Sequence, residues 1–128
     1  MPGPRKDALP PPPMIEINTS VEGNIKVISV AGKLGPLDGK ELRGVMQSSV
    51  DGKDAAHLVV DLEKLEYMAS AGFRELFFIG KQLERAGGKL VVCSLQGEVQ
   101  RIFVLARFDS AYPIFATRQE ALDYLNGQ

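Results

Sequence analysis

Two short apolar runs, His57–Leu62 (HLVVDL) and Lys89–Leu95 (KLVVCSL), constrain the fold of this chain most strongly. Each is rich in β-branched residues and has the length of a strand that is buried on both faces. Between them, apolar residues recur at helical spacing until Gly87-Gly88 ends the pattern, and they are Phe73, Leu76, Phe77, Gly80 and Leu83. Because a helix between two buried strands requires a crossover, the two runs predict parallel strands of one sheet.

A β-hairpin is expected at the start of the folded part. Met14–Ser20 and Ile25–Ala31 alternate apolar and polar residues on either side of a turn at 22–24. The segment before them, residues 1–13, holds six of the eight prolines and too few apolar groups to offset the entropy of ordering it. We therefore expect a disordered Pro-rich tail over 1–13 and a single domain over 14–128.

The remaining segments complete an α/β domain. Two helix starts have a capping-box pattern, in which Asp38 is followed by Glu41 and Thr117 is followed by Glu120. The predicted fold is a mixed, mostly parallel sheet of about five strands, packed with about four α-helices. Three further helices are expected, over 39–50, over about 98–107 and from Thr117 onward. A short strand is expected over 112–116.

The composition argues against several classes of function. Lys and Arg total 15 and Asp and Glu total 16, so the net charge is −1 and the basic excess of a nucleic-acid-binding protein is missing. No apolar run approaches the roughly 18 residues of a membrane span, and no signal peptide is visible. We therefore expect a cytoplasmic protein without nucleic-acid or membrane partners. One Cys and one His leave no recognisable metal or cofactor motif.

Four residues could carry chemistry, and a structural role is preferred for each. Asp61 and Glu63 could form a carboxylate pair, but their place at a strand end favours a solvated turn. Cys93 lies within an apolar strand, where a small core residue is preferred over a nucleophile. His57 opens a strand, which favours a surface or edge role. The sequence therefore predicts no enzymatic activity.

The junction Met68–Phe73 (MASAGF) is different, because it joins a strand to a helix. Sites in open parallel sheets gather beyond the carboxyl ends of the strands. Ser70 is expected at the helix N-cap or within one residue of it, where a phosphate would meet free N–H groups and the positive end of the helix dipole. The small residues Ala71 and Gly72 would let another protein approach the backbone. A simple capping role for the Ser70 hydroxyl is the alternative.

The chain resembles a STAS domain of the anti-sigma factor antagonist type over about residues 14–126. The segments that carry this resemblance most specifically are this junction, GGKLVVCSL and the terminal IFATRQEALDYL. The resemblance implies partner switching. The unphosphorylated protein would bind an anti-sigma factor with serine kinase activity, phosphorylation at the helix start would dissociate the complex, and a serine phosphatase would reset the switch.

The motif departs from the family pattern at two positions. Many members carry Asp-Ser-Ser-Gly or Asp-Ser-Thr-Gly, whereas this chain has Ala69 and Ala71 on either side of Ser70. The chain is closer to a subgroup that reads Ser-Ser-Ala-Gly. The loop Gly32–Gly35 also lacks the Asp that members often place there. Ser70 is the phosphoacceptor that the resemblance implies.

An aromatic residue stands out on the same helix. At about 100° per residue, Phe78 lies opposite the apolar stripe, among Arg74, Lys81 and Arg85. Aromatic and Arg side chains are enriched at protein interfaces. The predicted partner surface combines the loop, the helix start and this residue, namely Gly35, Pro36, Leu37, Asp38, Met68, Ala69, Ser70, Ala71, Gly72, Phe73, Arg74 and Phe78.

Other functions remain as alternatives. The changes at Ala69 and Ala71 favour a non-phosphorylated STAS scaffold or ligand-sensing module within a larger signalling assembly. A small enzyme is disfavoured because no catalytic set is visible. The expected oligomeric state is a monomer or a weak dimer.

Overall fold

The computed structural model describes residues 15–51 and 57–127, and within these ranges it shows a sheet of six strands and five helices. The α/β fold predicted from the sequence is confirmed. In chain order the elements are β1 (Ile15–Glu22), β2 (Ile25–Leu34), α1 (Gly39–Asp51), β3 (His57–Asp61), β4 (Leu65–Met68), α2 (Ser70–Arg85), β5 (Lys89–Cys93), α3 (Gly97–Leu105), α4 (Phe108–Ala111), β6 (Ile114–Phe115) and α5 (Arg118–Asn126). The proposed tail over 1–13 lies outside the described residues.

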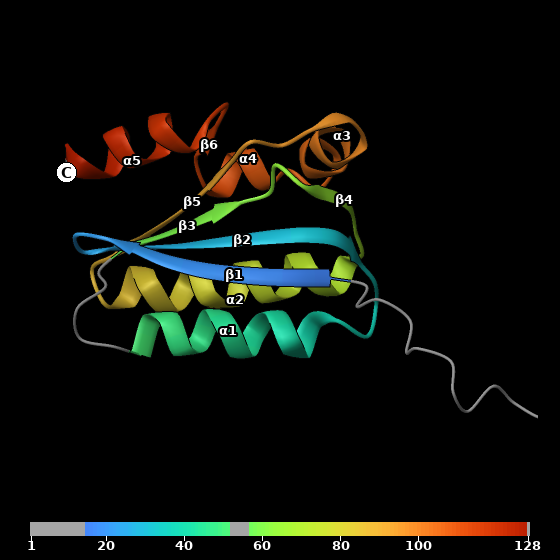
Figure 1. Cartoon of the computed structure of the whole chain (residues 1–128), viewed down its shortest axis with the longest axis horizontal. Helices are drawn as coiled ribbons and strands as arrows, with labels where there is room; N and C mark the ends of the chain where they lie inside the picture. Colours follow the sequence, from blue (N-terminus) through green and yellow to red (C-terminus); the bar gives the residue numbers. More distant parts are fainter. Residues whose placement is uncertain (1–14, 52–56, 128) are drawn as a thin grey trace, which may run out of the picture.

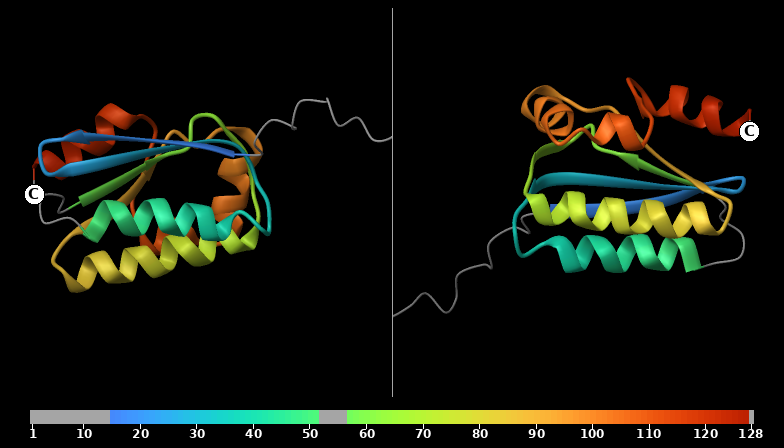
Figure 2. Two further views of the ribbon diagram at one scale, coloured as in Figure 1. Left: turned by 60° about the horizontal axis from the view of Figure 1, so that its bottom comes forward. Right: turned by 180° about the vertical axis from the view of Figure 1, so that it is seen from behind.

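The sheet separates two layers of helices (Figure 1). Its strand order is β1-β2-β3-β5-β6, with β1 antiparallel to β2 and the other pairs parallel. Helices α1 and α2 lie side by side on one face, as both views of Figure 2 show. Their apolar sides bury the larger core against Ile28, Val60 and Val92. Helix α5 covers the other face, where Ala121, Leu122 and Leu125 pack on Val27, Val59 and Val91.

Strand β4 and the short helix α4 were not expected from the sequence. Four residues are too few for a periodic pattern, and β4 forms because the second half of β2 offers it a partner: Leu34 aligns with Met68. The strand expected over 112–116 is shorter, because the N–H of Tyr112 donates to the carbonyl oxygen of Phe108 at 3.0 Å and Pro113 has no N–H to donate to a neighbouring strand. Of the surface or edge role expected for His57, the edge part is wrong, since β3 lies between β2 and β5. The residue is half-buried, and its Nδ1 accepts the N–H of Lys89 at 3.1 Å.

An ion pair fastens α5 to the sheet. The guanidinium of Arg118 donates from Nε to Oδ2 of Asp61 and from Nη2 to Oγ of Ser29, both at 2.8 Å. Oδ1 of Asp61 accepts the N–H of Glu63 at 3.1 Å, and the Asp61 side chain is only 7% exposed. The solvated turn predicted for Asp61 is therefore wrong, although Glu63 is exposed as expected. The expected Thr117 cap is confirmed, because Oγ1 accepts the N–H of Glu120 at 3.1 Å.

None of the helices in the described ranges has the length and apolar character needed to cross a membrane. The longest, α2, has 16 residues and keeps one side polar.

Gly80 is expected to be intolerant of even one added methyl group. A Cβ at this position in α2 would overlap the ring and hydroxyl of Tyr112 and lie 2.7 Å from its Cε1. Gly80→Ala should therefore lower the free energy of unfolding by about 2 kcal/mol, as overpacked cores do. Gly44→Ala is the control, because an added Cβ there on α1 meets nothing within 4 Å and should stabilise the helix by about 0.5–1 kcal/mol. Urea denaturation measures both, and equal effects would contradict the packing seen at Gly80.

The Asp61–Arg118 pair should show a strong coupling in unfolding measurements. Arg118→Met leaves the nearly buried Asp61 carboxylate without its cation and should cost about 2 kcal/mol, less than a fully buried pair because Arg118 is 40% exposed. Asp61→Asn leaves Arg118 able to reach water and should cost less. The double variant should be more stable than Arg118→Met alone. Additive losses in urea denaturation would show that the two side chains act independently.

Candidate functional site

The loop before α1 and the start of α2 lie side by side at one end of the sheet. The N–H of Ala69 donates to the carbonyl oxygen of Leu34 at 2.8 Å, which ties the end of β2 to the residue before α2. A Cβ added at Gly39, the first residue of α1, would lie 3.4 Å from Cβ of Ala71. We name this edge, residues 35–39 and 68–74, the rim. The predicted partner surface combined this loop and this helix start, and the structure confirms that they are neighbours.

Ser70 is the first residue of α2, and its side chain is exposed. The N-cap is Ala69, whose extended backbone (φ −76°, ψ 164°) offers no side-chain hydrogen bond. Ser70 was expected at the N-cap or within one residue of it, and the structure confirms that it lies one residue after the N-cap. The hydroxyl therefore stands at the positive end of a helix of 16 residues, where a negatively charged group is stabilised.

Gly72 allows the first turn of α2 to pack closely against Met68 and Leu34. An added Cβ there would lie 2.7 Å from Cγ of Met68 and 2.9 Å from Cδ2 of Leu34. Below it, the Phe73 ring lies 4.6 Å from that of Phe103, measured between centroids. These buried contacts hold the exposed Ser70 on a rigid support.

The structure divides the predicted contact residues by exposure. Pro36, Leu37, Ser70, Arg74 and Phe78 are exposed, and Leu37 is 94% exposed. Gly35, Asp38 and Ala71 are half-buried. Four residues of the rim are buried and are therefore not free to contact a partner. They are Met68, Ala69, Gly72 and Phe73.

Asp38 closes the loop of the rim. Its Oδ2 accepts the N–H of Gly35 at 2.7 Å, and its carbonyl oxygen accepts the N–H of Leu42 in the first turn of α1. The sequence predicted a capping box with Glu41, whereas the side-chain bond that the structure describes runs back to Gly35. The exposed Pro36 and Leu37 are thereby held in a tight turn beside α2.

Phe78 is 45% exposed on α2, so the predicted helical phase is correct. The guanidinium of Arg43 lies over its ring, with Cζ 4.1 Å from the centroid. Nε of Arg43 is also 3.5 Å from Oε1 of Glu75. The sequence grouped Phe78 with cations of its own helix and missed Arg43, because no local pattern links residues on α1 and α2.

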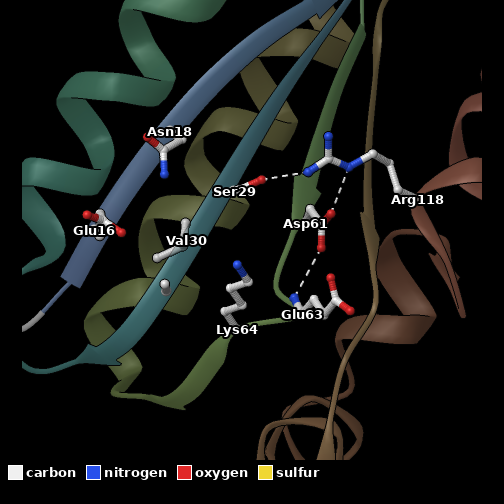
Figure 3. A pocket seen from close by; sticks show the side chains of 9 residues that line it. Glu16, Asn18, Ser29, Val30, Asp61, Glu63, Lys64 and Arg118 are labelled. Atoms are coloured by element: carbon white, nitrogen blue, oxygen red, sulfur yellow. Dashed lines mark hydrogen bonds and ion pairs between the residues drawn. The ribbon is translucent and has the colours of Figure 1, made fainter.

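A second candidate site lies on the face of the sheet that α5 covers. A polar pocket of about 230 Å³ opens beside the Asp61–Arg118 pair, where Glu16 and Asn18 project from β1 and Arg118 enters from the α5 side (Figure 3). Both oxygens of Asp61 and the Nε and Nη2 atoms of Arg118 already have partners, and no buried side-chain nitrogen or oxygen among the described residues lacks one. Glu16, Glu63 and Lys64 line the same pocket, so its remaining charges are mixed. Only Asp61, a carboxylate at the end of a buried strand, indicated this pocket in the sequence.

The two residues with reactive side chains are engaged in the fold. Cys93 is fully buried, and burial raises the pKa of its thiol to about 11, so the small core role expected from the sequence agrees with its position. Burial and the neighbouring Lys89 lower the pKa of His57, whose ring joins the starts of β3 and β5. Neither residue belongs to the rim.

Comparison with known proteins agrees with the fold. The family model described as the STAS domain matches residues 16–121. BtrV of Bordetella bronchiseptica, a protein named as an anti-sigma factor antagonist, is 30% identical over 95 residues, which cover 74% of this chain and 81% of BtrV.

Two solved structures share the fold. An anti-sigma factor antagonist from Mycobacterium paratuberculosis has a TM-score of 0.82 at 22% identity, covering 92% of this chain and 99% of that one. The phosphorylated form of SpoIIAA from Bacillus has a TM-score of 0.68 at 18% identity, covering 85% and 98%. The chain belongs to the STAS domain family and, within it, to the group of anti-sigma factor antagonists.

Proposed function

We propose that this protein is a partner-switching anti-sigma factor antagonist controlled at Ser70. In the unphosphorylated form it binds an anti-sigma factor that has serine kinase activity, and this binding releases the sigma factor. Phosphorylation of Ser70 then dissociates the complex, and a serine phosphatase restores the free hydroxyl. The protein acts as a regulator and a substrate in the cytoplasm and needs no catalysis of its own.

The observation that carries this proposal is the exposed Ser70 hydroxyl at the start of α2, next to the loop 35–38. A kinase must reach the acceptor hydroxyl, and the partner surface must include it if phosphorylation is to end binding. The rim meets both needs, because Ser70 is exposed next to the small Ala71, and Leu37, in the loop before α1, is exposed as well. In support, the related SpoIIAA has been solved in a phosphorylated form.

A phosphate at Ser70 would act by local electrostatics. It adds a charge of about −1.5 to −2, which the N-terminus of α2 can accommodate in the free protein. In the complex the same group would have to be desolvated against the partner, at a cost of several kcal/mol unless it is paired. The folded domain would thus tolerate the modification while the interface would not.

Phosphate transfer to Ser70 is the direct test. The protein is incubated with the candidate anti-sigma factor from the same genome and Mg-ATP, and the product is mapped by mass spectrometry. We expect one phosphate at Ser70, none in Ser70→Ala, and full transfer in Ser48→Ala, a control at an exposed serine of α1. Modification confined to Ser48, Ser49 or Ser94 would contradict the proposal.

Binding in the absence of ATP separates the proposal from its alternative. Ser70→Glu should weaken the complex by about tenfold or more, because it places a negative charge at the helix start. If the anti-sigma factor binds the wild-type protein and Ser70→Glu equally and transfers no phosphate, the protein is a non-phosphorylated scaffold. The loss of acidic and hydroxyl residues at Ala69 and Ala71 is the observation that favours this second function.

A further inference from the structure

The exposed side of α2 continues from the rim as a narrow stripe. At about 100° per residue, Ser70, Arg74, Phe78, Lys81 and Arg85 fall within an arc of about 80°. All five are exposed, and the positions opposite them face the core. With a rise of about 1.5 Å per residue, the stripe runs about 22 Å along the helix. We call these five residues the α2 stripe.

The α2 stripe is positively charged and not neutralised. In the part of the chain that the structure describes, Arg74, Lys81 and Arg85 form no ion pair with a carboxylate. The acids of the helix, Glu75 and Glu84, fall outside the arc, and Glu75 pairs with Arg43 of α1. Three unpaired cations in one row contrast with the net charge of −1 of the whole chain.

An aromatic ring in the middle of the α2 stripe is held in place. Phe78 is 45% exposed, and the guanidinium of Arg43 lies 4.1 Å from its ring centroid. Arg43 is itself held by Glu75, so the ring and the cation form a preordered pair. A preordered aromatic loses little conformational entropy on binding and is typical of interface anchors.

We propose that the α2 stripe docks an acidic, partly apolar surface of the partner protein, with Phe78 as the apolar anchor. This inference rests on the proposed function, since it names the chemistry of the same partner. A protein surface fits better than nucleic acid or an anionic membrane, because the cations form a single row with an aromatic at its centre on a chain whose net charge is −1.

The α2 stripe also explains why a phosphate at Ser70 would release the partner. Ser70 and Arg74 are four residues apart, so a phosphate on Ser70 can pair with Arg74 along the helix. The phosphate would withdraw that cation from the partner and repel the acidic surface at the end of the stripe. Release therefore follows from charge alone, without a rearrangement of the fold.

Isothermal titration calorimetry with the anti-sigma factor tests the inference in matched pairs of full-length variants. Arg85→Glu should weaken binding by about tenfold, because attraction becomes repulsion, whereas Lys26→Glu makes the same charge change away from α2 and should leave the affinity within about twofold. Phe78→Ala should weaken it by about tenfold, and Val21→Ala, at an apolar residue that is 57% exposed on β1, by less than about twofold. Thermal unfolding should show little change in all four.

The outcomes distinguish the two proposals. If the wild-type protein binds and the α2 variants bind as tightly as their controls, the α2 stripe is not the docking surface and the proposed function stands. If the wild-type protein does not bind the anti-sigma factor, both proposals fail. Binding to phosphatidylserine vesicles or duplex DNA that Arg85→Glu abolishes, with the anti-sigma factor unaffected, would assign the stripe to that polyanion and overturn the inference.

Discussion

The arrangement of the rim depends on how β2 is shared between two strands. Residues 25–29 of β2 pair with β3, and residues 32–34 pair with β4, which follows β3 after a short turn. Gly32 stands at the change of register, with φ at 100°, and its N–H donates to the carbonyl of Lys64 at 3.0 Å. Because β2 and β4 run in parallel, their ends reach the same edge, where the α1 loop and the start of α2 begin. Strand β4 thus leads the chain to Ser70 at that edge.

The rim combines a rigid floor with a small exposed surface. Met68, Gly72 and Phe73 are packed into the core, and the aromatic cluster with Phe103 and Phe108 supports the first turn of α2 from below. Such packing resists deformation, so a modification of Ser70 would change the charge and shape of the surface without changing the fold beneath it. This suits a switch in which phosphorylation alters the interface and leaves the domain folded.

The two faces of the sheet are held by different forces. On the α1 and α2 side, burial of a large apolar core provides the stability. On the α5 side, the apolar cluster is smaller, and the Arg118 bonds to Asp61 and Ser29 set where the helix lies. An ion pair with fixed geometry specifies orientation more than it adds stability, because the charges must lose water to form it. The α2 side, where the proposed partner surface lies, and this anchor are on opposite faces of the sheet (Figure 1), so each can vary without disturbing the other.

Local patterns in the sequence determined much of the fold and part of the site. The β-branched runs of β3 and β5, the Thr117 cap and the exposure of Phe78 follow from periods and neighbours within a few residues. Ser70 could be placed at a helix start for the same reason. Tertiary structure alone decided the rest: β4 forms only beside β2, Asp61 meets Arg118 across 57 residues, and Arg43 reaches Phe78 from another helix. These contacts depend on where the whole chain brings distant segments together, and no local pattern records that placement.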